Sequence, residues 1–196
     1  MRNFVFIFAI FILASCATNK TSEDIIWDEK FELCKEIQLE TNIEFNIADP
    51  SHKKYARNIY PLLENFLLQE KILTSISKEG YKQVVYNAIF EQIDPKIFEK
   101  FIHEIGFDPS LALANPISVY CYAYPYPYRE NQLRELKKGW QYEFLLVINK
   151  IYAEKGYSKD SIELFYSAID KIPEEKFSKE IYRRYFIDMV YKIAIR

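Results

Sequence analysis

Two cysteines in the body of the chain carry the side chains best suited to covalent chemistry. Cys34 and Cys121 are far apart in the sequence, and each thiol can either form a disulfide or remain free. Outside the cytoplasm the two thiols can pair as a disulfide. Cys34 also lies on the apolar side of an expected helix, where a free thiol is commonly buried and inert. A nucleophilic role would need a neighbouring histidine as base, and the sequence places none beside either cysteine.

The histidines and acidic residues do not form a recognisable catalytic or metal-binding motif. His52 and His103 belong to no paired-histidine motif, and the sequence contains no C-x-x-C pair. It also has no glycine-rich phosphate loop and no G-x-S-x-G elbow. Adjacent acids such as Glu174 and Glu175 stand where a helix should begin, and the helix dipole explains them there. We therefore expect no catalytic residue, no metal site and no cofactor.

The first sixteen residues have the layout of an export signal. Arg2 supplies a positive charge, and residues 4–13 form an unbroken apolar run that is too short to span a bilayer. Small residues and a cysteine follow in the order Leu13-Ala14-Ser15-Cys16. This order resembles the lipobox of the bacterial lipoprotein signal class, and the resemblance covers residues 1–16.

The resemblance implies a modification and an address. A diacylglycerol would be added to the Cys16 thiol, and cleavage after Ser15 would make Cys16 the acylated first residue of the mature protein. Several acyl chains anchor stably, because each buried methylene contributes about 0.8 kcal/mol. Ala17 stands where an aspartate would favour retention in the inner membrane, so the resemblance favours the outer membrane of a Gram-negative cell. The expected organisation is a signal peptide over 1–15, a lipidated polar tether over 16–25 and a single helical domain over 26–196.

The composition is that of a folded protein with an uneven distribution of charge. Hydrophobic residues make up 49% and aromatic residues 17% of the 196 residues, which is enough for a core. The net charge of −2 argues against nucleic acid as a partner. Residues 23–49 hold nine acids and two lysines, a net charge of −7, whereas residues 50–196 have a net charge of +3. Two interpretations stay open: this acidic segment docks on the rest of the domain or is solvated, or it steers a basic partner.

Helical periodicity dominates the rest of the chain. Apolar residues recur at three- and four-residue spacing within residues 27–38, 55–67, 81–93, 97–105, 140–152 and 182–193. Asp-Pro pairs at 49–50, 94–95 and 108–109 predict helix starts. Gly80, Gly106 and Gly156 are expected to end helices. We predict an all-α domain of six to eight amphipathic helices, arranged as a bundle or as a short stack of helix pairs. Two short segments recur later in the chain: residues 66–68 resemble 144–146, and residues 86–89 resemble 166–169. A diverged duplication would explain this likeness, and it would favour the stack of helix pairs.

One segment combines tyrosines and prolines in an alternating pattern. Tyrosine occupies every second position, at Tyr120, Tyr122, Tyr124, Tyr126 and Tyr128. Pro125 and Pro127 exclude a helix and a central strand, so the segment should be an extended loop with its rings on one side. Either the rings complete the core, or they form a surface that contacts a partner.

These observations favour a function in protein binding. We expect a non-enzymatic lipoprotein of the bacterial cell envelope that is held on a membrane through Cys16 and binds a protein partner. One form is an immunity-type inhibitor of an envelope toxin, suggested by analogy alone. The alternatives are an envelope enzyme or small-ligand-binding lipoprotein without a sequence motif, and a scaffold subunit of an assembly or transport complex.

Overall fold

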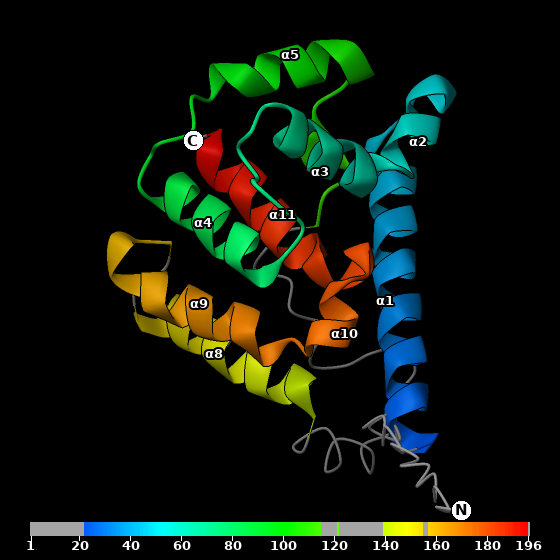
Figure 1. Cartoon of the computed structure of the whole chain (residues 1–196). Coiled ribbons are helices and arrows are strands. Elements are labelled where there is room, and N and C mark those ends of the chain that lie inside the picture. Colours follow the sequence, from blue (N-terminus) through cyan, green and yellow to red (C-terminus); the bar gives the residue numbers. More distant parts are fainter. Residues whose placement is uncertain (1–21, 115–120, 122–138, 155–156, 196) are drawn as a thin grey trace, which may run out of the picture.

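The part of the chain that the structure describes is helical. A computed structural model describes residues 22–114, 121, 139–154 and 157–195, with side chains from Trp27 onward except that of Glu154. These residues form nine α-helices and two short 3-10 turns, and they contain no strand (Figure 1). The predicted all-α class is confirmed. Within the same ranges, no helix combines the length and the apolar character needed to cross a membrane.

The helices fall into two groups along the chain. The first group comprises α1 (Ser22–Asn46), α2 (Pro50–Ala56), α3 (Ile59–Gln69), α4 (Lys78–Ile89), α5 (Lys96–Ile105) and the turn η1 (Pro109–Leu111). The second comprises α8 (Trp140–Glu154), the turn η3 (Lys159–Ser161), α9 (Ile162–Lys171), α10 (Glu174–Phe177) and α11 (Glu180–Ala194).

Local sequence signals fix several of these boundaries. Asp49, Asp94 and Asp108 each accept a hydrogen bond from the backbone N–H two residues later, at 2.8, 3.0 and 2.8 Å, where α2, α5 and η1 begin. Gly106 ends α5 with φ of 82°, as expected. The expectation for Gly80 is wrong, because it lies in the first turn of α4 and donates its N–H to the capping Ser77 hydroxyl. A Cβ on Gly80 would lie 2.1 Å from the Ser75 carbonyl oxygen, so this glycine is needed for space.

Helix α11 occupies the centre of the molecule. It packs on α3 and α4, while α9 covers α4 and α8 covers α9 (Figure 1). Twelve of its fifteen residues are buried, so nearly every face of α11 contacts another part of the protein. The segments suspected of duplication therefore pack differently: α8 and α9 pair directly, whereas α3 and α4 meet mainly through α11.

Aromatic rings fill much of the space around α11. Among the described residues, four pairs meet edge to face at centroid distances of 5.2 to 5.4 Å, and they are Tyr81–Phe177, Phe98–Tyr191, Phe144–Tyr185 and Tyr185–Phe186. Such pairs add about 0.5–1.5 kcal/mol each beyond the area they bury. Many of the chain's tyrosines and phenylalanines thus serve the core.

Candidate functional site

Helix α1 presents four rows of side chains, each row made of residues four positions apart. Residues at i and i+4 are neighbours on a helix surface, and such rows form ridges inclined to the helix axis. The inner row is Phe31, Lys35, Leu39 and Ile43, continued by Ile47 directly after the helix, and all five are buried. The acidic row is Asp28, Glu32, Glu36, Glu40 and Glu44. The polar row is Lys30, Cys34, Gln38, Asn42 and Asn46, and the outer row is Glu29, Leu33, Ile37, Thr41 and Phe45.

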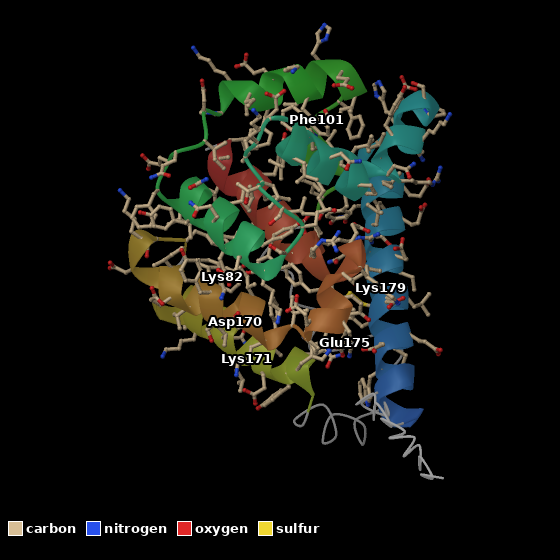
Figure 2. All side chains as sticks on the ribbon, viewed as in Figure 1. Lys82, Phe101, Asp170, Lys171, Glu175 and Lys179 are labelled. Carbon is tan, nitrogen blue, oxygen red and sulfur yellow. A yellow bond between two sulfur atoms is a disulfide. The ribbon has the colours of Figure 1, made fainter. Side chains whose placement is uncertain are left out.

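Every member of the acidic row forms an ion pair with another part of the domain. The pairs are Asp28–Lys176, Glu32–Lys179, Glu36–Arg184, Glu40–Arg57 and Glu44–Lys53, with N–O distances between 2.5 and 3.1 Å. The cations come from α2, α10, α11 and the residues that flank these helices. Figure 2 shows Lys179 where α10 and α11 approach α1. The charge asymmetry of the sequence is therefore matched mainly inside the molecule, which favours the docking interpretation for this row.

The polar row holds the chain that follows η1. The Asn42 amide donates to the carbonyl oxygens of Ala112 and Leu113 at 3.2 and 3.4 Å, and the Asn46 amide donates to that of Leu111 at 3.0 Å. Cys34 is joined to Cys121 by a disulfide with a Cα–Cα distance of 5.7 Å. Closing a loop across 87 residues stabilises the fold by about 4–5 kcal/mol in the chain-entropy account.

The outer row remains exposed on the side of α1 that faces away from the domain. Leu33 is 51% exposed, Ile37 44% and Phe45 84%, although the periodicity grouped Leu33 and Ile37 with the apolar line of this helix. Figure 1 shows α1 along one edge of the molecule, with α2 at its upper end. An apolar row on the long helix nearest the N-terminus is a candidate binding surface.

A first buried ionic group is centred on Glu64 of α3. Arg183 of α11 donates to both carboxylate oxygens of Glu64, with two N–O distances of 2.7 Å. The Tyr81 hydroxyl of α4 donates to the same carboxylate, and Arg183 also donates to the Phe177 carbonyl oxygen at 2.7 Å. Burial and the Glu64 charge raise the pKa of Tyr81 well above its usual value. This group ties α3, α4 and α11 together with directional bonds.

A second buried ionic group links α1, α3 and α11. Asp188 and Lys35 are 1% and 3% exposed, and Asp188 accepts a hydrogen bond from the Tyr60 hydroxyl at 2.9 Å. Burial raises the pKa of Asp188 to about 7 against the lowering effect of Lys35. Burial lowers the pKa of Lys35 to about 8 against the raising effect of Asp188. Both shifts show that desolvation outweighs the attraction between the two charges.

Arg184 completes this second group. Its guanidinium lies 4.7 Å from the Tyr60 ring centre and donates to Glu36 and Glu180 at 2.8 Å each. Its Nη1 is buried and has no hydrogen-bond partner among the residues that the structure describes. Buried charged groups of this kind, with shifted pKa values, often mark functional sites. Here they lie under α1, so they position the helix that carries the outer row.

Periodicity did not single out these buried charges. Arg183, Arg184 and Asp188 lie between the apolar residues of α11, at positions that a purely amphipathic helix would turn to solvent. The available signal was the spread of large apolar residues over all faces of this segment, which is typical of a buried helix. A charge in such a helix must be buried with a partner.

The other predicted site residues lie largely outside the described part of the chain. Leu13, Ala14, Ser15 and Cys16 lie outside the described residues, as do Tyr120, Tyr122, Tyr124, Tyr126 and Tyr128. His52 stacks on Phe107 at 5.6 Å beside Gly106, at the junction of α2 and α5. In the described ranges, no cluster of three or more histidine, cysteine, aspartate or glutamate side chains is arranged to hold a metal ion.

Comparison with other proteins leaves the family open. No protein-family model, curated protein or solved structure matches this chain.

Proposed function

We propose that this chain is a lipoprotein of the bacterial cell envelope, anchored through Cys16, that acts by binding another protein. The exposed apolar outer row of α1 is the observation that carries the binding function. Leu33 and Ile37 are neighbours in the row, and Phe45 extends it toward the end of the helix. Thr41 stands between Ile37 and Phe45, so the three apolar side chains lie along one row without forming an unbroken patch. An exposed apolar row of this kind marks a surface that a partner can cover.

Two further observations support the proposed address. The order Leu13-Ala14-Ser15-Cys16 supports lipidation, as argued above. The disulfide between Cys34 and Cys121 supports an oxidising compartment, because disulfides of this kind persist outside the cytoplasm. Lipidation of Cys16 would also remove the third thiol of this sequence, which leaves Cys34 and Cys121 as the pair that can bond within it.

The anchor is tested with Cys16→Ser. This substitution removes the lipid attachment point, so the protein should leave the membrane fraction or accumulate as an uncleaved precursor. Leu146→Ser serves as the control, because it changes an exposed side chain of α8 and leaves both the lipobox and the disulfide intact. A mature Cys16→Ser protein that still sediments with membranes as the wild type does would refute the anchor.

The binding surface is tested by site-specific photo-cross-linking in intact cells. A photoreactive phenylalanine analogue at Ile37 should link the chain to one discrete envelope protein. The same analogue at Leu146 of α8, which is 46% exposed, is the matched control and should not give that product. Equal products at both positions would refute binding through α1. The identity of the linked protein separates an immunity role from a scaffold role, because a toxin defines the first and an assembly component the second.

The tyrosine segment is a second proposed contact, and it is tied to α1 through Cys121. Replacing Tyr124, Tyr126 and Tyr128 together with Ser separates its two interpretations. Buried rings would cost about 3–5 kcal/mol each, so the triple variant would unfold if the rings belong to the core. For a contact surface, the melting temperature stays within a few degrees of the wild type while the Ile37 cross-link decreases. A collapse of the melting temperature would assign the segment to the core.

A further inference from the structure

The outer row of α1 has the shape of a ridge that fits another helix. Rows of i and i+4 residues pack into the groove of a facing helix at crossing angles of roughly −50° or +20°. The row from Leu33 to Phe45 spans twelve residue steps, or about 18 Å along the helix axis. Three turns of a partner helix would cover it. A helix of this length carries an apolar row of its own and does not need a preformed pocket.

The charges around the ridge define the partner further. Glu29 continues the outer row, is exposed, and has no ion-pair partner within the described residues. Glu36 is 52% exposed at its side chain and uses one carboxylate oxygen, Oε1, for Arg184. These two acids flank Leu33, and one of them lies on each side of it along the helix. Both acids lie on the side of Leu33 that faces the acidic row, whereas Lys30, three residues before Leu33, lies on its other side. A partner side chain on the acidic-row side of Leu33 therefore meets negative charge.

We propose that the outer row of α1 binds an amphipathic helix of a partner protein whose apolar row is flanked by lysine or arginine. This inference rests on the proposed function and adds the chemistry of the partner to it. Apolar side chains of the partner helix pack between Leu33, Ile37 and Phe45, and its cations lie beside Glu29 and Glu36.

Two other occupants fit the surface less well. A second copy would present the same outer row, which contains Glu29 and no lysine or arginine to face the Glu29 and Glu36 of the first copy. A bilayer surface would have to desolvate Glu29 and Glu36 together with the apolar residues, and anionic lipids would repel them. An amphipathic helix with basic flanks can pack on the apolar side chains and also form ion pairs with the two acids.

The test measures binding of two labelled peptides by fluorescence anisotropy. The protein used is residues 16–196 with Cys16→Ser, so that no lipid is present. One peptide is an eighteen-residue helix with a leucine row flanked by lysines, and the other has glutamate in place of every lysine. We expect the lysine peptide to bind at least about tenfold more tightly, and its affinity to fall as salt rises from 0.05 to 0.5 M.

Variants on and off the ridge make the result specific. Leu33→Ser with Ile37→Ser should weaken the lysine peptide by about tenfold or more, whereas Leu146→Ser on α8 should leave its affinity unchanged. Glu29→Lys should weaken the lysine peptide and strengthen the glutamate peptide. A circular dichroism melt of each variant checks that it remains folded, which is expected because these side chains are exposed.

The outcomes separate this inference from the proposed function. Equal affinities for both peptides, lost in the Leu33→Ser/Ile37→Ser variant, would overturn the basic character of the partner and leave binding through α1 intact. Peptide binding that survives every outer-row variant would overturn the inference, and so would a second copy as occupant, seen as a dimer by analytical ultracentrifugation. Binding of the unlipidated chain to lipid vesicles that depends on Leu33 and Ile37 would overturn the inference in favour of a membrane surface. An Ile37 cross-link to an envelope protein would still support the proposed function in each of these cases.

Discussion

Asp188→Asn should change the pH dependence of folding stability in a defined direction. The Asp188 carboxyl is buried on α11 and accepts its hydrogen bond from the Tyr60 hydroxyl. Asparagine has nearly the same shape, and its side-chain oxygen accepts the same bond. The substitution therefore removes the titrating group and keeps the packing.

The sign follows from the direction of the pKa shift. Burial raises the pKa of Asp188 from 3.8 to about 7, so between these values the folded protein binds a proton that the unfolded chain has lost. Stability contributed by this group is complete below pH 3.8 and is lost as the pH rises through about 7. From pH 5 to pH 8 the loss is roughly 2–3 kcal/mol, since each unit of pKa difference is worth about 1.4 kcal/mol.

Lys35 acts in the opposite direction, mainly at higher pH. Burial lowers its pKa from 10.5 to about 8, so its contribution is present above pH 10.5 and is lost as the pH falls through about 8. From pH 5 to pH 8 this lysine changes stability by less than about 1 kcal/mol. The joint contribution of Asp188 and Lys35 to the stability of the wild type should thus be lowest near pH 7 to 8.

Urea unfolding at pH 5, 6.5 and 8 measures the effect. Relative to wild type, Asp188→Asn should gain roughly 2–3 kcal/mol between pH 5 and pH 8. Asp160→Asn is the matched control, because Asp160 is exposed at the start of η3, and its difference from wild type should not vary with pH by more than about 0.5 kcal/mol. A constant difference between Asp188→Asn and wild type across this range would refute the idea that Asp188 titrates near neutral pH.

Three further predictions concern the fold. Lys71 and Glu91 both have a φ of 58°, a backbone conformation that disfavours residues with a Cβ. Lys71→Gly and Glu91→Gly should therefore each raise the free energy of unfolding by about 0.5–1 kcal/mol, and a lower value in urea titrations would contradict this. Arg183→Met leaves the buried Glu64 carboxylate without its cation and should cost about 3–5 kcal/mol, whereas Arg183→Met with Glu64→Leu should recover most of that loss; equal losses in both would show that the charge is not the cause. Reduction of the Cys34–Cys121 disulfide should lower the free energy of unfolding by about 4–5 kcal/mol, and a melting temperature unchanged by reductant would contradict the bond.

The amino-acid sequence by itself determined the features that depend on neighbouring residues. The helical class follows from apolar spacing, and the starts of α2, α5 and η1 follow from Asp-Pro pairs whose carboxylates bond to nearby backbone N–H groups. Both partners of each of these hydrogen bonds lie within a few residues of each other in the sequence. Gly106 ends α5 for the same local reason, since a positive φ suits a residue without Cβ.

Tertiary structure decided which side chains those helices bury. Leu33 and Cys34 are adjacent apolar residues of α1, yet Leu33 is exposed and Cys34 is bonded to Cys121. The role of Gly80 likewise could not be predicted from the sequence, because the carbonyl of Ser75 approaches it only in the folded chain. Arg183 and Asp188 are buried because α1, α3 and α4 enclose α11, and their partners Glu64 and Tyr60 lie more than a hundred residues earlier in the chain. The periodicity of one helix does not contain the positions of the others, so only the packed domain selects the outer row of α1 and the charges behind it.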